Sequence, residues 1–258
     1  MPHQPTVVIT IDKREGGSVA RVTYDNARKL NTLTPQLMTE FVEKVSGLAD
    51  ATDVRAIILT GAGEKAFIGG ADINVMAGLD KKKARAFITQ VHQVCDCLRQ
   101  LPMPVIARVN GYALGAGMEV VAACDLRVAA SSAVFGMPEV KVGIPSVVEA
   151  ALLPGLIGWG RTREVLLLGE NFDAETALRW GLVERVVAPR ELDAAVDQWI
   201  GSLFQAGPKA VRLQKQLIAH WEQLPLKEAI VAGIDSFASA FDSDEPARML
   251  GAFAKRGR

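Results

Sequence analysis

A glutamate beside a glycine-rich turn is the feature of this sequence best suited to proton transfer. Glu119 lies in VNGYALGAGMEVVAACDLRV (109–128), directly after Gly111, Gly115 and Gly117. Glycine lacks a Cβ atom, so a ligand can closely approach main-chain N–H groups in such a turn. The helix expected from about Gly115 adds its free N–H groups and positive dipole end. This arrangement favours proton transfer at a carbonyl, although acidic residues also favour first helical turns for electrostatic reasons alone.

Two further glutamates follow in an apolar stretch. Glu139 comes directly after Pro138 in FGMPEVKVGIP (135–145). Burial among these apolar neighbours would raise its carboxyl pKa, which suits a group that both gives and takes protons. The alternative is an ordinary surface carboxylate after a turn proline. Glu149 falls on an otherwise apolar helix, and we interpret it as structural.

A second glycine-rich turn follows the buried strand expected at Val54–Thr60. The segment GAGEKAFIGGADINVM (61–76) begins like a dinucleotide-binding fingerprint. That motif requires a continuous helix directly afterwards, and Gly69-Gly70 interrupts the segment. We therefore exclude dinucleotide binding and predict a tight loop in which Asp72 caps a short helix.

Regular elements of alternating type must position these turns. Glycines separate two β-rich runs that predict a hairpin, and Thr34 followed by Pro35 predicts the start of a helix. After the last strand only helices are expected, which indicates a separate C-terminal bundle and a domain boundary between residues 189 and 190. The expected strands are Thr6–Asp12, Ser18–Tyr24, Val54–Thr60, Val105–Val109 and Asp125–Ala129; the long central helix is Lys81–Leu101, and the last helices are 190–206, 208–220, 225–241 and 243–256.

Composition describes a globular protein and disfavours several functional classes. The 258 residues contain 29 basic and 29 acidic side chains, so no basic excess points to nucleic acid. No apolar run approaches membrane-spanning length. The three histidines are scattered, so we expect no metal site. The three cysteines are expected to be buried free thiols in a reducing cytoplasm: Cys95, Cys97 and Cys124.

The chain resembles the crotonase (enoyl-CoA hydratase/isomerase) superfamily over nearly its whole length. Five blocks in the same order carry the resemblance. They are AFIGGADI (66–73), PVIARVNGYALGAGMEVVAACDLRVAA (104–130), FGMPEVKVGIP (135–145), WGLVERVV (180–187) and AFDSDEPARMLGAFAKR (240–256).

The resemblance implies an α/β fold, a substrate class and a set of site residues. It implies a spiral of ββα turns over residues 1–189 and a helical oligomerisation region over 190–258, in trimers or pairs of trimers. The substrate would be an acyl-CoA thioester, with no separate cofactor. Its carbonyl oxygen would bind the N–H groups of Ala71 and Ala116, the latter often glycine in the family. The positions implied to contact CoA are Lys29, Ile68, Gly70, Asp72, Ile73 and Gly115.

Glu119 and Glu139 match the two glutamates of the hydratase branch of that superfamily. This branch adds water reversibly to 2-enoyl-CoA, giving 3-hydroxyacyl-CoA. The chain departs from the family after Glu139, where Ser146-Val147-Val148 replaces a more glycine-rich turn. The alternatives are another acyl-CoA reaction, such as double-bond isomerisation, and a non-catalytic acyl-CoA- or RNA-binding relative.

Overall fold

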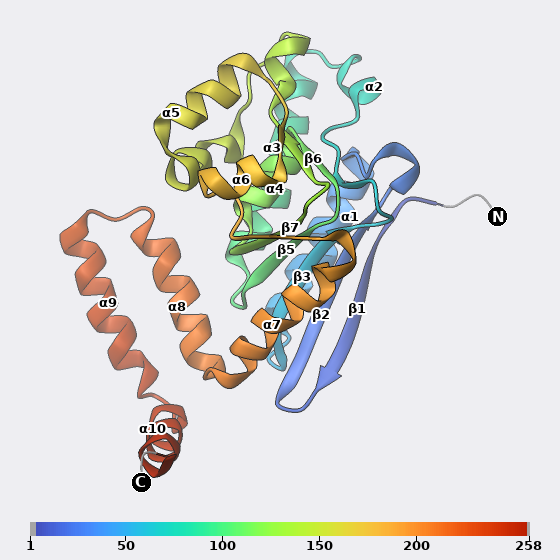
Figure 1. Ribbon diagram of the computed structural model, residues 1–258. Helices are drawn as coiled ribbons and strands as arrows, with labels where there is room; N and C mark the ends of the chain where they lie inside the picture. Colours follow the sequence, from blue (N-terminus) through green and yellow to red (C-terminus); the bar gives the residue numbers. More distant parts are fainter. Residues whose placement is uncertain (1–3, 257–258) are drawn as a thin grey trace.

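The computed structural model describes residues 4–256 and contains two β-sheets surrounded by helices (Figure 1). In the six-stranded sheet the order is β1-β2-β3-β5-β7-β10, and in the four-stranded sheet it is β4-β6-β8-β9. The first sheet contains β1 (Thr6–Arg14), β2 (Gly17–Asp25), β3 (Val54–Gly61), β5 (Val105–Val109), β7 (Leu126–Ala130) and β10 (Arg185–Val187). The second contains β4 (Ala66–Ile68), β6 (Tyr112–Leu114), β8 (Val134–Gly136) and β9 (Phe172–Asp173).

The chain alternates between the two sheets, as a spiral of ββα turns requires. The longer strands β3, β5 and β7 pair in parallel in the first sheet. Each is followed by a three-residue strand, and these short strands β4, β6 and β8 pair in parallel in the second. The fold expected from the family resemblance is therefore confirmed. The sequence alone places β4 and β6 within the two glycine-rich turns and assigns no strand to the residues of β8, because three residues show no periodicity.

Most helices cover the inner side of the six-stranded sheet and enclose the main apolar core. Helix α1 begins as predicted, since the Thr34 side chain accepts a hydrogen bond from the N–H of Leu37 and Pro35 takes the first helical position. The helices before the last strand are α1 (Pro35–Ser46), α2 (Ile73–Met76), α3 (Lys81–Gln100), α4 (Ala116–Ala123), α5 (Leu153–Leu168) and α6 (Ala174–Trp180). Two 3₁₀ turns that matter below are η3 (Pro138–Val142) and η4 (Val148–Leu152).

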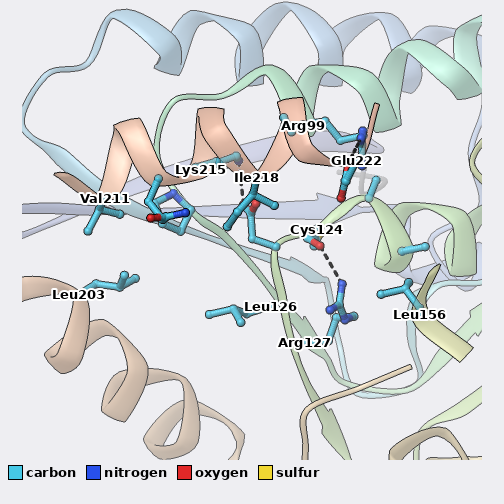
Figure 2. Close-up of a pocket in the computed structure, with 16 residues that line it drawn as sticks. Arg99, Cys124, Leu126, Arg127, Leu156, Leu203, Val211, Lys215, Ile218 and Glu222 are labelled. Atoms are coloured by element: carbon cyan, nitrogen blue, oxygen red, sulfur yellow. Dashed lines mark hydrogen bonds and ion pairs between the residues drawn. The ribbon is translucent and has the colours of Figure 1, made fainter. Parts of the chain in front are cut away.

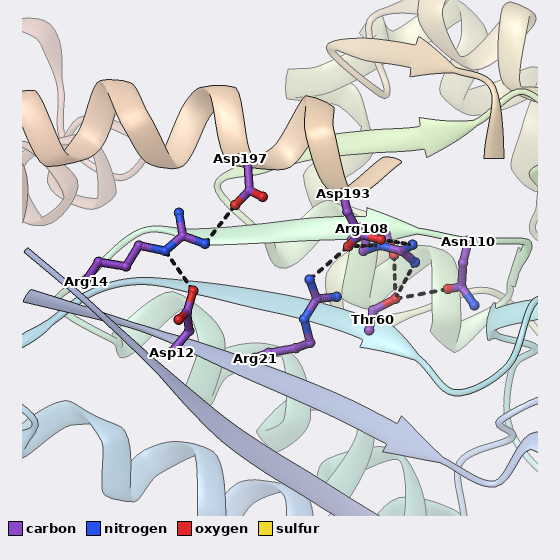
Figure 3. Close-up of polar contacts among 8 residues, drawn as sticks. All are labelled: Asp12, Arg14, Arg21, Thr60, Arg108, Asn110, Asp193 and Asp197. Atoms are coloured by element: carbon purple, nitrogen blue, oxygen red, sulfur yellow. Dashed lines mark hydrogen bonds and ion pairs between the residues drawn. The ribbon is translucent and has the colours of Figure 1, made fainter. Parts of the chain in front are cut away.

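Helix α7 (Leu192–Gln205) covers the outer face of the same sheet, where its apolar side packs on a second core cluster. Ion pairs fasten it across the strands (Figure 3). Asp193 accepts hydrogen bonds from Arg21 on β2 and from Arg108 on β5, and Asp197 accepts one from Arg14 on β1. The sheet is therefore covered on both faces, which explains why β3 is almost wholly apolar.

The last three helices extend away from the sheets (Figure 1). They are α8 (Pro208–Trp221), α9 (Leu226–Ala240) and α10 (Glu245–Arg256). All four C-terminal helices were predicted, but α7, which follows the predicted boundary at residue 189, packs on the sheet. The boundary itself stays a prediction. Within residues 4–256, none of the helices is long and apolar enough to cross a lipid bilayer.

Candidate active site

The turn before α4 has a backbone that suits glycine and little else. Gly115 is the N-cap of α4 and has φ 52° and ψ −124°, outside the regions that L-residues favour. A Cβ atom there would overlap the Oε1 atom of Glu139. Gly117 lies against the carbonyl oxygen of Ile68, so a side chain at that position would overlap β4. The two glycine-rich turns identified in the sequence are therefore packed directly against each other.

Each of these turns includes a main-chain N–H group that its own secondary structure leaves free. In the parallel bridge between Leu33 and Ala71, the Gly70 carbonyl and the Asp72 N–H bond to Leu33 at 2.8 and 3.0 Å. In a parallel pairing of this kind the N–H of Ala71 points to the opposite side. Ala116 is the first residue of α4, so its N–H has no intrahelical acceptor. That these two N–H groups bind one carbonyl oxygen stays a prediction.

Glu119 is a buried carboxyl group, not a surface residue that merely complements the dipole of α4. It lies in the first turn of this helix and is only 3% exposed. Burial raises the pKa of its carboxyl group to about 8, and the charges of Glu139 and Glu149 add to the effect. The backbone N–H groups of Val147 and Ala150 partly offset this rise. Burial thus favours the protonated form of Glu119, which suits a group in proton-transfer chemistry.

Glu139 lies at the start of η3, and β-sheet pairing brings it to α4. Leu114 on β6 pairs with Gly136 on β8, and the N–H of Gly115 donates to the carbonyl of Gly136 at 2.8 Å. Glu139 follows that strand directly, so its carboxylate lies over Gly115. The predicted burial of Glu139 is wrong: it is half-buried, because Val140 and Val142 turn toward solvent.

Ser146, in the segment where the chain departs from its family, contacts the site directly. Its hydroxyl group donates a hydrogen bond to Oε2 of Glu139 at 2.8 Å. The structure thus places the buried carboxyl group of Glu119 near the carboxyl group of Glu139, which accepts a hydrogen bond from Ser146. The catalytic roles of both stay predictions.

The positions expected to contact CoA lie near the first glycine turn. Asp72 caps α2 as predicted, since its side chain accepts from the N–H of Asn74 at 2.9 Å. Its second oxygen accepts a hydrogen bond from Lys29 Nζ at 3.0 Å, although the Lys29 side chain remains largely exposed. Ile73 is exposed, whereas the Ile68 side chain is fully buried. Any ligand contact by Ile68 must therefore use its main chain.

One polar pair near Glu119 was not anticipated from the sequence. His92 on α3 and Glu149 on η4 are separated by 57 positions in the sequence, and their side chains lie 2.7 Å apart, Nδ1 to Oε1. We had interpreted Glu149 as structural and His92 as an isolated histidine. A single acidic residue on an apolar helix was the only signal available. Within residues 4–256, which exclude His3, no cluster of side chains could hold a metal ion.

A cavity of about 410 Å³ lies beside α8 (Figure 2), and neither catalytic candidate is among the residues that line it. It borders Ala122, Ala123 and Cys124 at the C-terminal end of α4, whereas Glu119 lies in the first turn of that helix. Lys215 reaches into its wall and is held by the carbonyls of Leu98 and Met103 and by Asp125. None of the predicted site residues lines this cavity, so it is separate from the candidate site.

The sequence matches the protein family described as "Enoyl-CoA hydratase/isomerase" over residues 14–258. It is 36% identical to the short-chain-enoyl-CoA hydratase of Clostridium acetobutylicum, over 93% of this chain and 92% of that protein. It is 34% identical to the crotonyl-CoA hydratase of Syntrophomonas wolfei, over 96% of this chain and 95% of that protein.

The fold is similar to that of solved enoyl-CoA hydratases. The crystal structure of the enzyme from Bacillus anthracis superposes with a TM-score of 0.90 at 32% sequence identity. The superposition covers 96% of this chain and 96% of that one. Sequence and structure comparisons therefore agree along almost the whole length of the chain.

Proposed function

The chain belongs to the enoyl-CoA hydratase/isomerase family, and we propose that it hydrates 2-enoyl-CoA thioesters reversibly, with Glu119 and Glu139 as its catalytic residues. The observation that supports these roles is the meeting of the two carboxyl groups at the first turn of α4. Burial gives one of them a raised pKa, and a serine hydroxyl group binds the other. A carboxyl group whose pKa is raised toward neutrality can both give and take protons in one reaction.

In the proposed reaction the thioester carbonyl oxygen accepts hydrogen bonds from the N–H groups of Ala71 and Ala116. Nucleophilic attack at C3 pushes electrons through the conjugated system onto this oxygen, so negative charge develops there in the transition state. Donors fixed in place before the reaction stabilise that charge without reorganising, and losing one costs roughly 100- to 1,000-fold in rate in comparable sites.

The two carboxyl groups carry out the proton transfers that accompany the addition of water. One carboxylate removes a proton from the water as its oxygen bonds to C3, and a proton from the protonated partner is delivered to C2. The product carries the hydroxyl group at C3 and the new hydrogen at C2, and the pair again holds one proton. No separate cofactor enters this scheme, because coenzyme A is part of the substrate.

We propose further that the CoA portion lies along the first glycine turn, near Gly70, Asp72 and Ile73. Lys29 is the cation best placed to meet a phosphate group, since its ammonium group is fixed beside Asp72 and still faces solvent. The backbone of Ile68 and Gly115 would border the same ligand. A cytoplasmic location fits three cysteines that are all buried as free thiols.

Apolar side chains exposed on α9 and α10 support a homo-oligomer, which we propose to be a trimer or a pair of trimers. Scattered exposed apolar residues are normal, but a row of large ones along two neighbouring helices is typical of an interface. These residues are Leu226, Ile230, Val231, Ile234, Phe237, Phe241, Leu250 and Phe253. Sedimentation equilibrium tests the proposal, and a monomer at micromolar concentration would contradict it.

Loss of the 2-enoyl absorbance of crotonyl-CoA tests the hydratase proposal. We expect activity in the wild type and a loss of about 100-fold or more in each of Glu119→Gln and Glu139→Gln. Glu15→Gln, in the exposed β1–β2 turn, is the matched control and should keep full activity. Product analysis by chromatography must show 3-hydroxybutyryl-CoA. A shifted double bond instead would indicate isomerisation.

A further inference from the structure

Val148 has a backbone conformation that is unusual for valine. Its φ is 39°, in the left-handed region that glycine tolerates and β-branched residues avoid. Leu30 and Asn31 also have a positive φ, but neither branches at Cβ. In the same loop the chain does use glycine at such a position, Gly143, where φ is 81°. A strained residue persists only where its surroundings enforce the strain, and such residues are frequent at functional sites.

Two hydrogen bonds fasten the chain before Val148 to Glu139. The N–H of Ile144 donates to the main-chain carbonyl of Glu139 at 3.2 Å, and the Ser146 hydroxyl group donates to Oε2 of its carboxyl group at 2.8 Å. The other oxygen of that carboxyl group, Oε1, lies over Gly115, the N-cap of α4. The Glu139 carboxyl group is therefore held between Ser146 and the turn in front of α4.

The chain after Val148 is fixed to the body of the protein. The Val148 side chain is half-buried and packs against the main apolar core. The turn η4 begins at this residue, packs on α4 and also contacts α3 and α5. Val148 thus joins the segment that carries Ser146 to these helices, and the direction of its backbone decides where the serine hydroxyl group lies.

We propose that Val148 is a positioning residue, whose side chain is anchored in the core and holds residues 144–148 in the one conformation that keeps Ser146 on the Glu139 carboxyl group. Glycine would accept the same φ without strain, but it would accept many other angles as well. The inference rests on the proposed function, because the place of Glu139 matters only if Glu139 takes part in the reaction. Val148 acts through Ser146 and does not contact the reacting atoms in this scheme.

The kinetics of Val148→Gly test the proposal, because this change removes the anchor and the strain together. We expect kcat for crotonyl-CoA hydration to fall about 10-fold, as in Ser146→Ala, with KM changed less than about twofold. Val148→Ile keeps the branched side chain in the core and should keep the wild-type kcat. A wild-type kcat in Val148→Gly, or a rise in KM alone, would overturn the proposal.

Val42→Ala is the matched control for lost packing, and it is compared with Val148→Ala. Val42 on α1 is also half-buried and packs against the same core. Both changes remove the same two methyl groups and should lower the melting temperature. Only Val148→Ala should lower kcat. If kcat were the same in both variants, Val148 would support the fold alone, and the positioning role would be wrong.

The double variant Ser146→Ala/Val148→Gly tests the route by which Val148 acts. If Val148 acts through Ser146, the double variant should lose about 10-fold in kcat, no more than either single variant, because both changes remove the same interaction. Independent effects would multiply to about 100-fold. That result would show that Val148 affects the rate by another route, and it would contradict the proposal.

Amide hydrogen exchange without substrate separates this inference from the proposed function. The N–H of Ile144 exchanges when its hydrogen bond to Glu139 opens, so Val148→Gly should speed this exchange by about 10-fold or more, whereas Val42→Ala should not. Unchanged exchange in a protein that hydrates crotonyl-CoA would reject the positioning role alone. A wild type that does not hydrate crotonyl-CoA, together with faster exchange in Val148→Gly, would reject hydration and keep Val148 as the residue that holds the segment.

Discussion

Replacing Gly115 with alanine tests whether the position of the Glu139 carboxyl group, and not only the stability of the fold, sets the rate of the reaction. The added Cβ atom would lie well inside contact distance of Glu139 Oε1. Glu139 is the flexible partner, so its carboxylate must retreat by about 1 Å to restore ordinary packing, for which non-bonded atoms need about 3.5 Å. The backbone angles of Gly115 add strain of about 1–3 kcal/mol, because φ is 52° and ψ is −124°.

The expected consequence is a folded enzyme with a misplaced catalytic group. A displacement of about 1 Å at a reacting group costs on the order of 100-fold in rate, and we expect kcat for crotonyl-CoA hydration to fall by that factor. The melting temperature should fall as well, because the strained backbone at position 115 destabilises the folded state. Stopped assays over a range of substrate concentrations separate kcat from KM.

Gly16→Ala is the matched control for backbone strain. Gly16 also has a positive φ, 85°, but a Cβ atom there meets no other atom, and the residue lies in the β1–β2 turn. The control should lose stability and keep its kcat. If Gly115→Ala retained more than about a third of the wild-type kcat, the argument that Gly115 and Glu139 compete for one space would fail.

Three further outcomes follow from the same contacts. The pKa of Glu119 is raised to about 8, so its unfolded form loses a proton at lower pH than its folded form does. The free energy of unfolding of the wild type should therefore fall relative to that of Glu119→Gln as pH rises from about 4.5 to 8. The expected fall is a few kcal/mol, since one pKa unit corresponds to about 1.4 kcal/mol. Urea unfolding at several pH values measures it, and an equal dependence of stability on pH in both proteins would contradict it. Ser146→Ala removes the hydrogen bond to Glu139 and should lower kcat roughly 10-fold without a comparable change in KM, because a hydrogen bond to a charged group contributes about 1.5 kcal/mol. Lys29→Ala should raise KM for the CoA thioester about 3- to 10-fold and leave kcat unchanged, while Lys13→Ala, an exposed lysine on β1, should change neither.

Local sequence was sufficient to predict most of the regular elements. Helix α1 begins where Thr34 and Pro35 indicate. Helix α3 ends one residue before the predicted amphipathic stretch does, and its apolar side faces the core. These signals act within a few residues, because capping hydrogen bonds and helical periodicity are short-range. The short strands β4, β6 and β8 of the second sheet carry no such signal. They exist because neighbouring turns of the spiral pair with one another.

In the candidate site, too, the sequence predicted some features and tertiary packing decided the others. The sequence alone identified Glu119, Glu139 and the glycine turns, because residue type and order match one family along nearly the whole chain. It could not predict which carboxyl group is buried. The packing of η4 on α4 encloses Glu119, whereas the neighbours of Glu139 turn outward. Burial is a property of the assembled layers, and it raises the pKa of the Glu119 carboxyl group.

Contacts between distant segments were decided by the tertiary structure alone. The pairing of β6 with β8 carries Glu139 to Gly115, and the packing of α3 beside η4 brings His92 to Glu149. The sequence determined the element types, the glycine positions and the family, since these depend on local conformation and residue order. The protonation of the site depends on charges brought together from separate helices and turns, and only the folded chain fixes the distances between them.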